Sequence, residues 1–328
     1  MSRSYCGLYV DAGYLEHAAA TRLTGSSYRG GITVTYEQLI EGLAAQITEH
    51  AGLPLLRVHW YDGAADRGNV ASPTQKRIEL LPHVKVRLGR RTNEGLQKGV
   101  DVRIGLDLAT HSRMSNVDVV YLLSGDDDLT EAVEEAQGHG AQVNVLAVPG
   151  AGDRPHGLAE HLARAADEVV LVATDLLDQC VQRATRPTPA AIPAPQPAAG
   201  KPAASAPRPQ APGVGVPTPA TVADAANGNT QPVVYSSTTG GRSVIAHHLA
   251  SEPISDEAMR SVCRNVVKSW KSSATQADLV ELRASKPSIP SELDRALLLD
   301  MSDTSGQYEL DLATRHRLRG MFWDVIDD

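Results

Sequence analysis

Short apolar runs alternate with longer amphipathic segments along the first 185 residues. This alternation is typical of an α/β fold, in which a mainly parallel sheet is covered by helices. The apolar runs predict strands at Cys6–Val10, Leu55–Tyr61, Val84–Leu88, Val117–Leu123, Gln142–Ala147 and Glu168–Leu171. The segments between them predict helices at Tyr36–His50, Ser72–Leu81, Val100–Ser112, Leu129–Gly138 and Gly157–Ala165.

A proline-rich segment follows this pattern. Residues 186–232 hold 12 of the 20 prolines and 13 alanines, without any hydrophobic period that would build a core. We therefore expect a disordered linker between an N-terminal domain, residues 1–185, and a C-terminal accessory domain, residues 233–328.

The C-terminal domain is predicted to be mainly helical. Ser255, followed by two acidic residues, predicts a helix start. Apolar residues then recur at steps of three and four on one helix face, which indicates a core stripe: Met259, Val262, Val266, Val267 and Trp270. A strand at Gln307–Leu310 would allow a winged-helix-like arrangement.

Composition and short motifs exclude several classes of function. The chain of 328 residues has a net charge of −8, so any nucleic-acid contact must come from a local basic patch. No run approaches the 18 apolar residues of a membrane span, and the first residues do not form a signal peptide, so we expect a cytoplasmic protein. The three cysteines are far apart, which excludes a cysteine-based zinc site. The usual glycine-rich nucleotide-binding motifs do not occur.

Four aspartates form the strongest chemical pattern. Asp11 and Asp126 each follow an apolar strand, and the carboxyl ends of parallel strands meet at one edge of the sheet, where ligands bind. Asp101 and Asp128 lie at the entries of predicted helices, where each alone is also explained as a helix cap. A convergent cluster of carboxylates without His or Cys indicates a Mg²⁺ or Mn²⁺ site rather than zinc.

Three motifs resemble those of the NYN domain, a branch of the PIN-like nuclease superfamily related to the bacterial LabA-like proteins. They are Tyr9-Val10-Asp11-Ala12-Gly13-Tyr14-Leu15, Lys98-Gly99-Val100-Asp101-Val102 and Ser124-Gly125-Asp126-Asp127-Asp128-Leu129. The resemblance covers residues 4–172 and implies a PIN-like α/β/α sandwich. It also implies a metal-dependent ribonuclease with Asp11, Asp101, Asp126 and Asp128 as catalytic, metal-binding carboxylates. Many members carry Asn where this chain has Tyr14.

An acidic site repels a phosphodiester, so substrate binding requires nearby cations. The basic stretch before Asp101 includes Arg87, Arg90, Arg91 and Lys98, and Arg67, Lys76 and Arg77 follow the second predicted strand. A solvated basic face is the alternative explanation. Candidate substrate contacts are Ser124, Lys98, Arg90, Arg91 and Tyr14.

The sequence thus predicts a ribonuclease that hydrolyses RNA, with single-stranded RNA as its partner. The alternative is a catalytically weak RNA-binding or regulatory adaptor that keeps the fold, and a DNA nuclease is a lesser alternative because no motif reads the 2′-hydroxyl. The C-terminal domain would contribute substrate choice, a protein partner or self-association.

Overall fold

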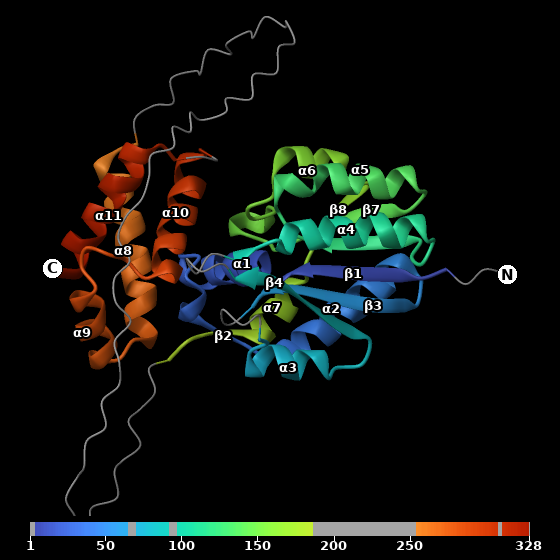
Figure 1. The fold of residues 1–328 in the computed structure, drawn as a ribbon, viewed down its shortest axis with the longest axis horizontal. Coiled ribbons are helices and arrows are strands. Elements are labelled where there is room, and N and C mark those ends of the chain that lie inside the picture. Colours follow the sequence, from blue (N-terminus) through green and yellow to red (C-terminus); the bar gives the residue numbers. More distant parts are fainter. Residues whose placement is uncertain (1–3, 65–69, 92–96, 186–253, 308–309, 328) are drawn as a thin grey trace, which may run out of the picture. The chain divides into compact units, whose positions relative to one another are not determined.

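A seven-stranded sheet forms the centre of the N-terminal region (Figure 1). The computed structural model describes residues 4–64, 70–91, 97–185, 254–307 and 310–327. Within them the strand order is β5-β4-β3-β1-β6-β7-β8, and all neighbours pair in parallel except β5, which is antiparallel to β4. The strands are β1 (Cys6–Asp11), β3 (Leu55–Gly63), β4 (Val84–Arg91), β5 (Gln97–Lys98), β6 (Val119–Leu123), β7 (Gln142–Ala147) and β8 (Glu168–Leu171).

Helices cover both faces of this sheet (Figure 1). One face carries α1 (Ala12–Thr24), α2 (Tyr36–Ala51), α3 (Pro73–Glu79) and α7 (Thr174–Cys180). The other face carries α4 (Val100–Arg113), α5 (Thr130–Gly138) and α6 (Glu160–Ala165). Each face has its own hydrophobic core, with Leu43 of α2 in one and Leu108 of α4 in the other. The predicted α/β/α sandwich with a mainly parallel sheet is confirmed.

Some elements of the N-terminal region were not predicted. Helix α1 is rich in alanine, and its buried residues include Ala18, Ala19 and Ala20, so it has no stripe of large apolar residues to mark it. A two-stranded antiparallel sheet joins β2 (Ile32–Val34) to β9 (Val181–Arg183). Three residues are too few to show the alternation by which strands are predicted.

The described residues after the proline-rich segment form helices α8 (Asp256–Ser273), α9 (Gln276–Ala284), α10 (Ser291–Ser305) and α11 (Leu312–Asp327). Ser255 caps α8 as predicted, because its hydroxyl accepts a hydrogen bond from the Ala258 backbone N–H at 3.2 Å. The apolar stripe that starts at Met259 lies in the core of this region. The expected strand at Gln307–Leu310 lies partly outside the described residues.

The described residues on either side of the proline-rich segment belong to one compact unit. A buried hydrogen bond joins the two regions, from the backbone N–H of Ser27 to Oδ1 of Asp300, at 2.8 Å. The proposed linker lies outside the described residues, so the domain boundaries at 185 and 233 stay predictions.

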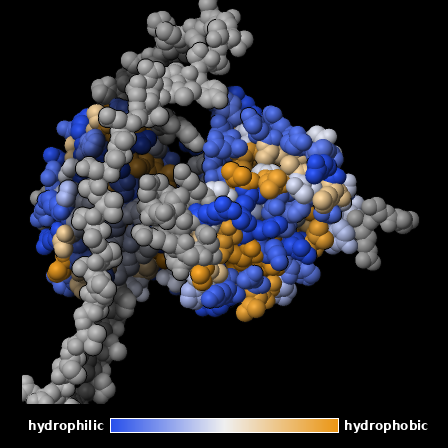
Figure 2. Space-filling model, in the orientation of Figure 1, coloured by the Kyte–Doolittle hydropathy of each residue, from blue (hydrophilic) through white to orange (hydrophobic). Residues whose placement is uncertain are grey.

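The face drawn in Figure 2 is mainly hydrophilic over the N-terminal region, with smaller hydrophobic patches between. Large apolar side chains that are exposed include Val102 and Leu106 on α4 and Leu299 on α10. Among the described residues, no helix has the length and apolar character needed to cross a membrane.

Candidate functional site

Asp11 ends the central strand of the sheet and starts helix α1. Its Oδ1 accepts a hydrogen bond from the Tyr14 backbone N–H at 3.2 Å, so the carboxylate caps the helix. Its Oδ2 accepts from the hydroxyl of Ser124 at 3.4 Å. Strand β1 lies between β3 and β6, and the carboxyl ends of these parallel strands meet around Asp11.

Asp126 lies in the turn that follows β6. The backbone N–H of Asp126 donates a hydrogen bond to the hydroxyl of Ser124 at 3.3 Å. The backbone N–H of Asp128 donates to Oδ1 of Asp126 at 3.1 Å. Gly125 allows this turn, because a Cβ there would stand 1.9 Å from the carbonyl oxygen of Gly157. Close packing of two backbone segments therefore fixes the position of Asp126.

Two adjoining hollows bring the predicted carboxylates together. The smaller, about 240 Å³, is lined by Asp11 and Asp101, and the larger, about 760 Å³, is lined by Asp11 and Asp126. Both are also lined by Tyr14 and His17 of α1. Asp11 therefore lies where the two hollows adjoin, and we call them together the Asp11 crevice.

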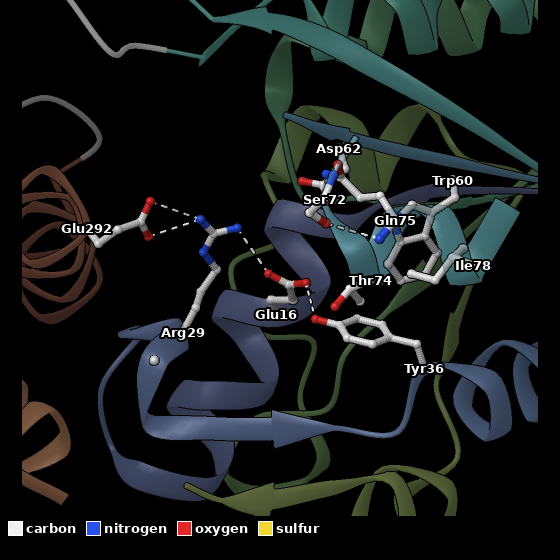
Figure 3. A pocket seen from close by; sticks show the side chains of 11 residues that line it. Glu16, Arg29, Tyr36, Trp60, Asp62, Ser72, Thr74, Gln75, Ile78 and Glu292 are labelled. Atoms are coloured by element: carbon white, nitrogen blue, oxygen red, sulfur yellow. Dashed lines mark hydrogen bonds and ion pairs between the residues drawn. The ribbon is translucent and has the colours of Figure 1, made fainter. Parts of the chain in front are cut away.

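Asp62 is a further carboxylate of this crevice that the sequence interpretation did not include. It lines the smaller hollow with Asp11 and Asp101, and also a third hollow of about 350 Å³, which Figure 3 shows. The side-chain amide of Gln75 donates to its Oδ2 at 2.6 Å. Its signal was present, since Asp62 follows the predicted strand Leu55–Tyr61 as directly as Asp11 follows the first strand.

Burial and mutual repulsion shape the charges of this site. The pKa of Asp11 is raised from 3.8 to about 7, mainly by burial, against the lowering effect of the Tyr14 N–H. The charges of Asp101 and Asp126 raise it further, which is consistent with carboxylates that face one another. Burial also raises the pKa of Asp126 and that of Asp62.

Other predicted residues lie apart from the crevice or are used within the fold. The side chain of Asp128 is exposed and lines neither hollow, and Ser124 is fully buried. Asp127 contacts His161, at 3.1 Å between Oδ2 and Nδ1. In the part of the chain that the structure describes, no three His, Cys, Asp or Glu side chains are grouped so that they hold a metal ion ready-made.

The two ends of the basic stretch before Asp101 pair as strands. Arg90 pairs with Lys98, and Arg91 with Gln97, as β4 and β5 run antiparallel. Arg90 is exposed, whereas the side chains of Arg91 and Lys98 lie outside the described residues.

Arg87 was wrongly grouped with the basic rim. Its Nε lies 3.1 Å from Oδ2 of Asp107, which also accepts the Tyr61 hydroxyl at 2.8 Å, so its charge is used between α4 and the sheet. The sequence pattern does not reveal this partner, because Asp107 follows twenty residues later on another element. Arg67 lies outside the described residues. Arg77 lies 3.8 Å from a carboxylate oxygen of Glu37.

A match to the NYN domain family covers residues 6–173, just over half of the chain. The protein belongs to the NYN domain family. The NYN domain is part of the PIN-like nuclease superfamily, which confirms the resemblance inferred from the three motifs.

Two similar proteins have no assigned function in their names. The uncharacterized protein y4oD of Sinorhizobium fredii is 39% identical over 77 residues, which are 24% of this chain and 36% of that relative. A solved structure of a protein of unknown function, VPA0982 from Vibrio parahaemolyticus, has 22% sequence identity and a TM-score of 0.39. That match covers 53% of this chain and 95% of the other.

Tyr14, which stands where many NYN domains have Asn, holds two backbone segments in place. Its hydroxyl donates to the carbonyl of His156 at 2.7 Å and accepts from the N–H of Val148 at 3.3 Å. Tyr14→Phe should therefore lower the free energy of unfolding by about 1–3 kcal/mol. Chemical denaturation would measure this loss. Tyr5→Phe is the control, since the Tyr5 hydroxyl has no hydrogen bond to the described residues, and equal stability of the two variants would contradict this role for Tyr14.

The raised pKa of Asp11 predicts how the metal-free NYN domain responds to pH. The folded chain holds a proton on Asp11 between about pH 4 and pH 7 that the unfolded chain has lost, so stability should fall as pH rises through this range. Asp11→Asn should reduce this fall, of which Asp126 and Asp62 keep their share, and should be more stable than the parent at pH 8 by up to about 4 kcal/mol. Denaturation in chelator at pH 4.5 and pH 8 measures both values. A parent protein whose stability rises between these pH values more than that of Asp11→Asn would contradict the prediction.

Proposed function

We propose that the NYN domain is a metal-dependent ribonuclease that hydrolyses RNA phosphodiester bonds at the Asp11 crevice. The observation that supports this most is the place of Asp11 at the junction of the two hollows, with Asp101 lining one and Asp126 the other. We propose Asp11, Asp101 and Asp126 as ligands of Mg²⁺ or Mn²⁺, and Asp128 as a further one from its place beside Asp126.

The donor set fits these cations. Mg²⁺ and Mn²⁺ prefer oxygen ligands, and the crevice offers carboxylates. Mg²⁺ is usually bound through one or two carboxylates with water and substrate phosphate, rather than in an all-protein cage. Asp11 and Asp101 on the smaller hollow and Asp11 and Asp126 on the larger, without a ready-made group of three metal ligands among the described residues, are consistent with this mode.

The residues of the chain would hold the cation and orient its carboxylate ligands. A bound cation supplies an activated water and neutralises charge on the leaving oxygen. Ser124 and the Tyr14 N–H orient the two oxygens of Asp11, while the Asp128 N–H orients Asp126. Because these contacts exist before any ligand binds, little rearrangement of the carboxylates is needed.

One observation favours the alternative, an RNA-binding protein with weak or absent catalysis. Among the described residues, no three His, Cys, Asp or Glu side chains stand together as a ready-made cation site. Such a protein would bind RNA without consuming it.

A cleavage assay separates the two functions. Labelled single-stranded RNA and a DNA of the same sequence are incubated with the full chain in Mn²⁺, in Mg²⁺ and in excess chelator. We expect the RNA to be cut with either cation and to stay intact in chelator. RNA that is bound but uncut under all three conditions would support the adaptor, and preferential cutting of the DNA would replace the assignment by a DNA nuclease.

A further inference from the structure

Arg295 of helix α10 lines the smaller hollow together with Asp11 and Asp101. Helix α10 follows the proline-rich segment, so this residue comes from outside the NYN match at residues 6–173. Of the described residues that line this hollow, Arg295 is the one Lys or Arg. It forms no hydrogen bond or ion pair with any other described residue.

The two faces of α10 explain how Arg295 reaches the carboxylates. One face carries Leu293, Leu297 and Met301, which are buried in the core of the helical region. On the other side, Arg295 and Leu299 are four residues apart and lie on one face of the helix. Both line the smaller hollow. The helix thus packs on its own core and presents Arg295 and Leu299 to the NYN domain.

Contacts on either side of Arg295 hold α10 in this position. The guanidinium of Arg29 donates to both carboxylate oxygens of Glu292, at 2.9 and 3.1 Å, and also to Glu16 at 3.0 Å (Figure 3). Further along, Asp300 accepts the Ser27 N–H and is only 8% exposed. These contacts fix the backbone of α10 on both sides of Arg295, so the helix itself needs no rearrangement when the side chain binds a ligand, which favours binding.

The positive charge of Arg295 affects the ionisation of His17, which lines the same hollow. The pKa of His17 is lowered to about 3, mainly by burial and then by the charges of Arg29 and Arg295. His17 is therefore neutral at physiological pH and does not compete for an anion. The opposing charges at the hollow are the carboxylates Asp11, Asp62 and Asp101.

A guanidinium among carboxylates suits a substrate that is itself anionic. The planar fork of Arg binds phosphate oxygens through two parallel hydrogen bonds. Without such a cation, the only charged side chains that a phosphodiester would meet among the described lining residues are carboxylates.

We propose that Arg295 contacts a phosphate of the RNA beside the carboxylates of Asp11 and Asp101, so that α10 completes the substrate site of the NYN domain. This inference rests on the proposed nuclease function. It makes the helical region a part of the site. In the opposite role, Arg295 is a counter-ion that neutralises the carboxylates and must be displaced by the substrate. This role predicts that RNA binds more tightly when Arg295 is removed.

The test compares Arg295→Ala and Arg295→Lys with the parent in the full chain. Arg260→Ala is the matched control, because Arg260 is exposed on α8 and lines none of these hollows. One arm measures the affinity for a labelled single-stranded RNA of twelve nucleotides in chelator over a range of salt. The second arm measures kcat and KM for cleavage in Mn²⁺. Thermal melts confirm that each variant is folded.

We expect Arg295→Ala to bind the RNA about tenfold more weakly, as for the loss of a hydrogen bond to a charged group. The slope of log affinity against log salt should fall by about 0.7, for one lost phosphate contact on a single strand. Cleavage should fall at least as much, with Arg295→Lys between Ala and the parent, because Lys keeps the charge and loses the fork.

Two results would overturn the inference. In one, Arg295→Ala binds and cleaves like Arg260→Ala. In the other, it binds or cleaves better than the parent, as a counter-ion predicts. If the parent protein cuts no RNA with any cation, the proposed ribonuclease function is refuted instead. The binding measurements would still decide whether Arg295 contacts the RNA backbone.

Discussion

Asp11→Asn should lower RNA cleavage on the order of a thousandfold, about 4 kcal/mol in activation free energy. Asp11 lines both hollows, so its loss removes a carboxylate charge from each of them. Asn keeps the size of the side chain and an acceptor oxygen for the Tyr14 N–H, so the fold should be retained. Single-turnover cleavage in Mn²⁺ gives the rate.

The control for this substitution is Asp175→Asn, which changes the net charge equally at an exposed position on α7. It should cleave like the parent. If Asp11→Asn keeps more than a tenth of the parent rate while folded, Asp11 is not a ligand of the catalytic cation.

Gly125→Ala should disable the site through packing. The added Cβ would stand 1.9 Å from the Gly157 carbonyl oxygen and 2.7 Å from the Tyr14 ring. A backbone atom is among these neighbours, so the turn before Asp126 must shift. We expect a loss of about 1–3 kcal/mol in the free energy of unfolding, as for other overpacked sites. Cleavage should fall together with stability, because Asp126 moves with the turn.

Gly138→Ala tests whether any change from Gly to Ala has this effect. Gly138 ends helix α5, and a Cβ there would meet no atom within 4 Å. Such a substitution should be neutral or stabilise the protein by up to about 1 kcal/mol. Denaturation curves and cleavage rates of both variants decide the matter, and equal effects would refute the packing argument at Gly125.

The sheet could be predicted because most of its strands are apolar runs, and β1, β6 and β7 are buried along most of their length. Gln142–Ala147 and Glu168–Leu171 were predicted with the bounds observed. Helix α1 could not be recognised by the same criterion, because four of its five buried residues are alanines. Local patterns record large buried side chains well and small ones poorly.

The place of Asp11 and Asp126 was predictable because parallel strands bring their carboxyl ends to one edge. Asp62 carried the same signal and was overlooked. The ion pair of Arg87 with Asp107 and the approach of Arg295 to Asp11 depend on tertiary packing between distant segments. No spacing in the sequence records such contacts, so a basic residue near a motif was a weak guide to its role.

The central claim is that the Asp11 crevice binds a divalent cation, and thermal melts with and without Mn²⁺ test it without a substrate. A ligand that binds only the folded protein raises the melting temperature, and the rise follows its affinity. We expect millimolar Mn²⁺ to raise the melting temperature of the parent and of Asp175→Asn alike, and to raise that of Asp126→Asn much less. A parent that melts at the same temperature in Mn²⁺ and in chelator, or an Asp126→Asn that gains as much as the parent, would contradict the account.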